Sequence, residues 1–328
     1  MLDRRTLLHA GAAATLLAGV PGTLRAQSMP STGRLIFGLA AGSVGSRFAS
    51  AVLRMMADDY DMRYDLQIID TGEGLDAARV VKVSPADGAT LLQAQAGSMT
   101  VFPSIYERLP YDPLNDFVPI AILGEYAYAL VLGPAVPVSI NTVDGYLKWV
   151  TDNPDFRDLG FSIYGSEGHL AALSFARAKE VALRPQSYRT PLSMFGDLRS
   201  GALAACVAIC GNVPTLGVEG VRAVAVSGAR RQAVWPEVPT FKEAGVGDIV
   251  INGWYGWFGP SGISNSLARS LNGNIRKLQA TSKYADLQGR LLLDNVMLDP
   301  AQITERMRSE IGLYKGMVQS FGLSRISG

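Results

Sequence analysis

Short apolar runs alternate with amphipathic segments along most of this chain, and that alternation limits the folds it can adopt. The apolar run at 34–40 is followed by the small-residue loop 41–46, and then by Phe48, Val52 and Met56 at the spacing of one helix face. Further strands are expected at 64–70, 89–94, 118–123, 127–132, 159–164, 202–210, 221–227 and 249–258. Further helices are expected at 75–83, 143–151, 169–182 and 194–200, with a last helix capped by Asp299 and Gln302. This pattern predicts an α/β fold whose mostly parallel sheet is covered by helices.

Three loops that join a predicted strand to the next helix consist mainly of small residues, at 42–46, 97–100 and 165–168. The first N–H groups of a helix have no partner inside the helix, and the helix dipole makes that end positive. Such loops therefore suit an anion, for example a carboxylate. Most loops of this kind only reverse the direction of the chain. For each loop taken alone, a purely structural role and anion binding are about equally expected.

The first 26 residues have the order of an export signal. Arg4 and Arg5 precede an apolar run at 10–20, which is shorter than the roughly 20 residues that a membrane-spanning helix needs. We expect cleavage after Ala26 and a periplasmic mature protein, and the paired arginines favour the twin-arginine route. The alternative is a buried N-terminal helix.

Charge argues against nucleic acid as a partner. Removing the signal, with Arg4, Arg5, Arg25 and Asp3, changes the net charge from +1 to −1. A nucleic-acid-binding domain carries a strongly basic patch, and nothing of that kind stands out here. About 300 remaining residues are enough for two lobes with sizeable cores.

Residues for catalysis are scarce. Gly38, Gly42 and Gly45 loosely resemble a dinucleotide-binding loop, which keeps an exported Rossmann-type oxidoreductase open as an alternative, but their spacing departs from G-x-G-x-x-G. No G-x-S-x-G elbow occurs, and His169 is the single histidine after residue 26. One histidine and two cysteines without ligand spacing also argue against a zinc site. We expect no enzyme, no cofactor and no metal.

The two cysteines, Cys206 and Cys210, are four residues apart. In a strand they would lie about 13 Å apart, too far for a disulfide, which needs Cα atoms within about 7 Å. A helix would bring them near enough. Free buried thiols are the favoured interpretation, and a bridge stays open.

Three segments carry a family resemblance. Residues 109–119 read LPYDPLNDFVP, residues 236–245 read PEVPTFKEAG, and residues 253–262 read GWYGWFGPSG. In this order they resemble signature segments of the Bug-type periplasmic solute receptors of tripartite tricarboxylate transporters.

The resemblance implies a two-lobed periplasmic binding protein of type II-like fold, with two crossover strands and a ligand cleft between the lobes. The expected division is 27–124 plus 254–328 for one lobe and 125–253 for the other. The implied function is to bind a small organic carboxylate, as a monomer, and deliver it to membrane transporter subunits. A ligand-sensing partner of a membrane kinase is the alternative.

The same resemblance suggests which residues contact the ligand. They are Ser43, Val44, Gly45, Ser46, Ala96, Gly97, Ser98, Thr100, Tyr164, Gly165, Ser166, Tyr188, Arg189 and Asn212. The chain departs from the family pattern in the loop 41–45, which lacks an aspartate, and at Gly211, where an aspartate is common. Glu167 stands in the shortened loop 165–168. These changes predict an atypical ligand, such as an aromatic or bulkier acid.

Overall fold

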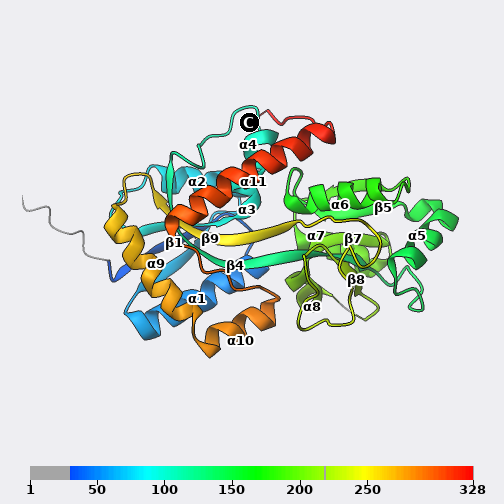
Figure 1. The fold of residues 1–328 in the computed structure, drawn as a ribbon, viewed down its shortest axis with the longest axis horizontal. Coiled ribbons are helices and arrows are strands. Elements are labelled where there is room, and N and C mark those ends of the chain that lie inside the picture. The colour runs from blue at the N-terminus through cyan, green and yellow to red at the C-terminus, as the bar shows by residue number, and fades with distance from the viewer. Residues whose placement is uncertain (1–29, 218, 328) are drawn as a thin grey trace, which may run out of the picture.

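The computed structural model describes residues 30–217 and 219–327, so the expected export signal lies outside the described residues. In this part of the chain the strands form one nine-stranded sheet in the order β2-β1-β3-β9-β4-β7-β5-β6, with β8 paired to β4 (Figure 1). The strands are β1 (Thr32–Phe37), β2 (Arg63–Ile68), β3 (Thr90–Gln95), β4 (Phe117–Leu132), β5 (Asp158–Ser162), β6 (Arg184–Tyr188), β7 (Ala205–Ile209), β8 (Arg222–Val226) and β9 (Asn252–Pro260). The α-helices are α1 (Val44–Tyr60), α2 (Leu75–Lys82), α3 (Ala96–Thr100), α4 (Phe102–Ile105), α5 (Val143–Asp152), α6 (Glu167–Ala178), α7 (Pro191–Ser200), α8 (Val213–Leu216), α9 (Asn265–Gln279), α10 (Ser282–Leu291) and α11 (Pro300–Ser320).

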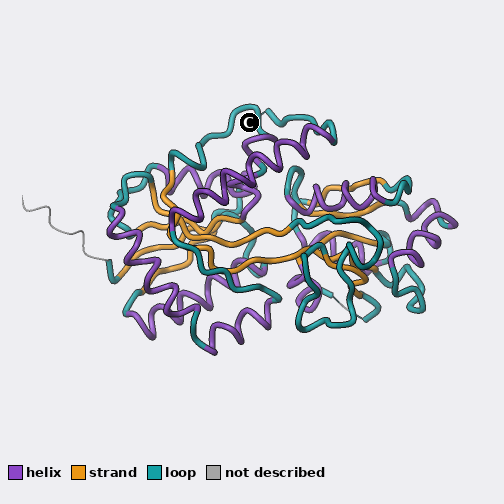
Figure 2. The backbone as a smooth tube through the Cα atoms, viewed as in Figure 1, coloured by secondary structure: helices purple, strands orange, loops and turns teal. Residues whose placement is uncertain are grey.

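The two ends of the sheet are parallel, as the strand–helix alternation predicts. β1 pairs in parallel with both β2 and β3 at one end, and β5 pairs in parallel with β6 and β7 at the other. Helices cover the strands of each half (Figure 2). The α/β, two-lobed prediction is confirmed.

Two antiparallel strands connect these halves. β4 pairs with β9 from Phe117 opposite Pro260 to Ala127 opposite Asn252, and its later residues pair with β7 and β8. The two runs expected on either side of Gly124 are therefore one strand, with register shifts that let it bend. β4 and β9 are the two expected crossover strands, and they pass between the halves in Figure 1.

The C-terminal region joins the first half of the sheet. Asp299 and Gln302 form the expected capping box, and the buried face of α11 includes Ile303, Met307 and Val318. The sequence pattern predicts no element at 265–291, where α9 and α10 lie, and none at β6. β6 is short and almost fully exposed, so it lacks the apolar signal of a buried strand.

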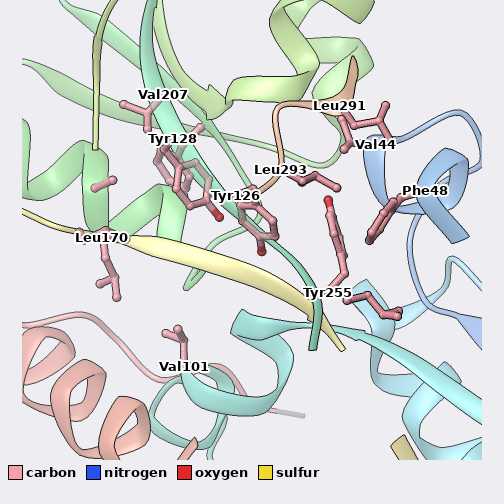
Figure 3. Close-up of a cluster of buried hydrophobic side chains, with 14 of the residues drawn as sticks. Val44, Phe48, Val101, Tyr126, Tyr128, Leu170, Val207, Tyr255, Leu291 and Leu293 are labelled. Carbon is pink, nitrogen blue, oxygen red and sulfur yellow. The ribbon is translucent and has the colours of Figure 1, made fainter. Parts of the chain in front are cut away.

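Buried side chains from distant parts of the sequence meet around β4 and β9 (Figure 3). Val44 and Phe48 of α1 lie on one side, and Leu170 of α6 and Val207 of β7 on the other. Tyr126, Tyr128 and Tyr255 stand between them. Tyr126 and Tyr255 have ring centroids 4.9 Å apart. The strands that connect the halves are thus packed into the core.

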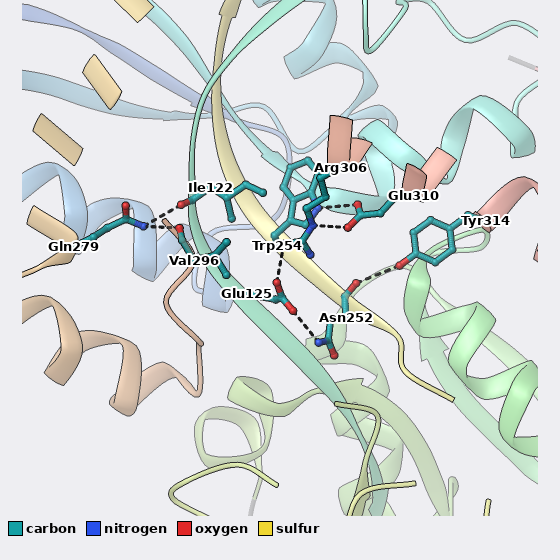
Figure 4. A network of polar contacts seen from close by, with 9 residues as sticks. All are labelled: Ile122, Glu125, Asn252, Trp254, Gln279, Val296, Arg306, Glu310 and Tyr314. Atoms are coloured by element: carbon teal, nitrogen blue, oxygen red, sulfur yellow. Dashed lines mark hydrogen bonds and ion pairs between the residues drawn. The ribbon is translucent and has the colours of Figure 1, made fainter. Parts of the chain in front are cut away.

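A polar network holds α11 against both crossover strands (Figure 4). Arg306 donates to Glu125 of β4 at 2.8 Å and to Glu310 at 2.6 Å. Glu310 also accepts from the indole of Trp254 in β9, and Glu125 accepts from Asn252. Burial opposes the charge on Arg306, but the two carboxylates outweigh burial and raise its pKa. None of the described helices is both long enough and apolar enough to cross a membrane.

Candidate functional site

A cavity of about 270 Å³ lies where the two halves of the sheet face each other. It is lined by residues at the carboxyl ends of β1, β2, β3, β5, β6 and β7 and by the side chains of Tyr128 and Tyr255. β2 and β6 are the outermost strands of the sheet order, so the curl of the sheet brings their loops to one place. Ligand sites of open α/β sheets lie at such strand ends.

Three helices whose N-cap side chains accept a capping hydrogen bond begin at this cavity. Their N-cap residues, Ser43 of α1, Ser166 of α6 and Thr190 of α7, all line it. Each cap oxygen accepts a hydrogen bond from the backbone N–H three residues later, at 3.3, 3.2 and 3.1 Å. The N–H groups of a first helical turn have no acceptor inside the helix, and Pro191 at the start of α7 has no N–H. The positive ends of three helix dipoles therefore face the same space.

Charged side chains stand at the edge of the cavity. Arg189, after β6, is exposed, and no ion pair holds it among the residues that the structure describes. Asp70 and Glu73, after β2, line the opposite side. Burial raises the pKa of Glu73, while a hydrogen bond from Tyr106 at 3.4 Å and the charge of Arg189 act in the other direction. One cation and two carboxylates thus share one cavity.

Beneath Tyr128 lies a fully buried carboxyl group. Glu167, the first residue of α6, accepts a hydrogen bond from the Tyr128 hydroxyl at 3.3 Å, and its Oε1 has no partner among the described residues. Gly97 of α3 leaves room for this carboxyl group, since a Cβ there would stand 2.7 Å from Glu167 Oε2. Burial raises the pKa of Glu167 to about 8, so it is largely neutral at pH 7.

Replacing Glu167 with glutamine is expected to flatten the pH dependence of stability. The folded chain keeps a proton that the unfolded chain releases near pH 4.5, so the free energy of unfolding falls as pH rises from about 4.5 to 8. The slope approaches about 1.4 kcal/mol per pH unit at most. Urea unfolding between pH 6.5 and 8.5 measures it, and parallel curves for wild type and Glu167→Gln would contradict the buried proton.

Five of the fourteen residues that the sequence singled out line the cavity. They are Ser43, Val44, Ser166, Arg189 and Asn212. They come from both halves of the sheet, and three of them are N-cap residues: Ser43 of α1, Ser166 of α6 and Asn212 of α8. Their contact with a ligand stays a prediction.

Five others lie close by without lining the cavity. Gly45 is buried, and a Cβ there would stand 2.5 Å from Phe37 and 2.7 Å from Tyr255. Ser46 faces a separate groove. Gly165 donates its N–H to His169, while the hydroxyls of Tyr164 and Tyr188 donate to Ser324 and Asp197.

The segment 96–100 is not the loop we expected. It forms the short helix α3, in which Thr100 donates to the Ala96 carbonyl at 2.9 Å and Ser98 donates to the Gln95 carbonyl at 2.7 Å. Packing against α4, α11 and β9 favours the helix over a turn. Gln95, just before it, lines the cavity, whereas Ala96, Gly97, Ser98 and Thr100 do not.

Several residues at the cavity were missed from the sequence. The charged ones are Asp70, the last residue of the second expected strand at 64–70, and Glu73, three residues further on. The rule that carboxyl ends of neighbouring parallel strands share one edge would have found both. Tyr128 and Tyr255 lie inside long strands, where no local pattern distinguishes a cavity wall from a core residue.

The residues that could support other chemistry are buried and engaged. His169 stacks on Phe161 with ring centroids 4.1 Å apart, and burial lowers its pKa to about 4. Cys206 and Cys210 are free and buried, and burial raises the pKa of both thiols. Among the described residues, no cluster of three or more His, Cys, Asp or Glu side chains could hold a metal ion.

Comparison with known proteins agrees with this architecture. The Bordetella pertussis protein BugT is 23% identical over 93% of this chain and 94% of BugT. R. palustris Rpa4515, solved with adipate, has a TM-score of 0.83 at 21% identity, covering 91% of this chain and all of that one. MatC from Rhodopseudomonas palustris, solved with bound malate, has a TM-score of 0.76 at 21% identity, covering 88% of this chain and all of MatC. Because both structures are only 21% identical in sequence to this chain, the comparison shows similarity of fold alone.

Residues 69–323 match the tripartite tricarboxylate transporter family receptor, TctC. The match spans most of the chain and includes all three segments that carried the resemblance. The family consists of receptors rather than enzymes, which confirms the expectation of a non-enzymatic protein. The chain therefore belongs to the TctC receptors of the tripartite tricarboxylate transporter family and is an extracytoplasmic solute receptor.

Proposed function

We propose that this receptor binds a small organic carboxylate in the cavity between β1, β2, β5 and β6 and delivers it to the membrane subunits of a tripartite tricarboxylate transporter. The observation that carries the proposal is the meeting of three helix N-termini and one unpaired guanidinium, Arg189, at one cavity. Backbone amides at helix ends and an arginine fork both suit a carboxylate. The adipate and malate found with two structures of the same fold support this ligand class.

Binding would shift an equilibrium between open and closed lobes. We assign one lobe to 27–124 plus 254–328 and the other to 125–253, with β4 and β9 as the connection between them. The cavity takes residues from both sides, such as Ser43 and Asp70 from one and Ser166 and Arg189 from the other. A ligand that contacts both sides favours the closed arrangement by its difference in affinity for the two states. We expect the receptor to act as a monomer in the periplasm after twin-arginine export.

Native mass spectrometry of the purified protein, followed by isothermal titration with a panel of aliphatic and aromatic carboxylates, tests the proposal. We expect a co-purified organic acid or measurable binding of at least one panel member. A protein that binds no carboxylate after denaturation, refolding and removal of any retained ligand would refute it. Aromatic acids belong in the panel because this chain departs from the family pattern in its first loop.

A further inference from the structure

The charges around the cavity are not those expected for a receptor of dicarboxylates. Two carboxylates, Asp70 and Glu73, line it together with one guanidinium, Arg189, and no other charged side chain does so among the described residues. The lining is therefore net negative when all three groups are ionised. A dianion bound there would place both its charges near a wall that already carries excess negative charge.

Neither acid at the cavity forms an ion pair with any residue that the structure describes. The Asp70 side chain makes no hydrogen bond or ion pair with any of the residues that the structure describes, and it is exposed. Glu73 is half-buried and accepts one hydrogen bond, from Tyr106. The charge of Arg189, which comes from the opposite side of the cavity, acts to lower the pKa of Glu73. A carboxylate in this position is partly desolvated and gains from a cation placed beside it.

Binding of a carboxylate at Arg189 changes that balance. The guanidinium is the group that a ligand carboxylate would engage, together with the N-termini of α6 and α7. Once it does so, less of the Arg189 charge compensates Glu73. Asp70 and Glu73 are then left facing the remainder of the ligand, and a positive group on the ligand would restore the balance.

The backbone holds Glu73 where it is. Gly72, Glu73 and Gly74 have φ angles of +60°, +54° and +97°, so a charged non-glycine residue occupies the left-handed region between two glycines. That conformation costs on the order of 1 kcal/mol for a residue with a Cβ. Glu73 thus lines the cavity from a backbone conformation that glycine would adopt at lower cost.

We propose that the cavity takes an amphoteric ligand, a carboxylate that also carries an ammonium or similar cationic group, with Arg189 and the helix N-termini holding the carboxylate and Asp70 and Glu73 selecting the cation. This inference rests on the proposed function, because it assigns the second end of a ligand whose first end is the carboxylate. It makes Asp70 and Glu73 specificity-determining residues.

Isothermal titration at low ionic strength with matched pairs of ligands tests the inference. Each pair has the same skeleton and differs in one end group: succinate with 4-aminobutanoate, adipate with 6-aminohexanoate, and terephthalate with 4-(aminomethyl)benzoate. In the pair that fits the cavity best, we expect the amino acid to bind at least about tenfold more tightly than the diacid, the size of one charge interaction in a partly screened site.

Two variants show whether Asp70 and Glu73 cause the preference for amino acids over diacids. Asp70→Asn combined with Glu73→Gln should reduce the preference at least about tenfold, while retaining the Tyr106 hydrogen bond and the melting temperature. Asp65→Asn, an exposed carboxylate on β2 that does not line the cavity, is the matched control and should leave the preference unchanged.

The outcomes separate this inference from the proposed function. Tighter binding of the diacids by the wild type, or an unchanged preference in the double variant, overturns the amphoteric ligand and leaves carboxylate binding intact. Absence of binding by every carboxylate in the panel overturns both. A preference for the amino acids that the double variant loses and Asp65→Asn keeps supports both.

Discussion

Replacing Arg189 with glutamine is expected to weaken binding of the receptor's carboxylate ligand by about 30-fold. Arg189 is the one cation that lines the cavity in the described part of the chain, and no intramolecular ion pair competes for it. Removing one partner of a charged pair costs about 2–5 kcal/mol when the pair is desolvated. Because Arg189 is exposed, we take the lower end, and each 1.4 kcal/mol corresponds to a factor of about ten. Isothermal titration measures the change.

The Arg189→Gln substitution should weaken ligand binding without lowering the stability of the fold. Since the Arg189 side chain has no hydrogen bond within the described residues, the melting temperature of Arg189→Gln should match the wild type. Arg199→Gln, at the opposite end of α7 and away from the cavity, is the charge-matched control and should bind normally. Equal affinities for Arg189→Gln and Arg199→Gln would show that the guanidinium does not hold the carboxylate.

Replacing Arg306 with methionine is expected to lower the free energy of unfolding by about 3 kcal/mol. The side chains of Arg306, Glu125 and Glu310 are 24%, 18% and 15% exposed, so they are mostly shielded from water. Methionine keeps much of the volume of Arg306 but leaves two carboxylates without their shared cation (Figure 4). Breaking a buried charge network by removing one partner typically costs 3–5 kcal/mol. Urea unfolding at neutral pH measures it.

A second variant separates charge from packing. Adding Glu125→Gln and Glu310→Gln to Arg306→Met removes the uncompensated charges, while the glutamines keep an acceptor for Asn252 and for the Trp254 indole. We expect this triple variant to recover at least half of the lost stability. If it is no more stable than Arg306→Met, the loss comes from packing of α11 against β4 and β9 rather than from unpaired charge.

The sequence predicted the α/β class and the capped last helix because both depend on local pattern, whereas the two crossover strands were implied by the family resemblance. Apolar runs of strand length, helical spacing at Phe48 and Val52, and the Asp299–Gln302 cap all act within a few residues. β6 escaped detection because its residues are exposed, and burial is what produces an apolar pattern. The helix α3 was mistaken for a loop because small residues favour turns unless tertiary packing favours a helix.

For the candidate site, the loop pattern identified two of the three helix N-termini with capping side chains at the cavity, and the family resemblance pointed to its arginine, Arg189. Neither identified Asp70, Glu73, Tyr128 or Tyr255, which reach the cavity from an edge strand and from the two crossover strands. Local pattern determined which loops can hold an anion, because helix ends are set by nearby residues. Only the curl of the sheet decided which of those loops meet, since it brings together the ends of β2 and β6, strands more than a hundred residues apart.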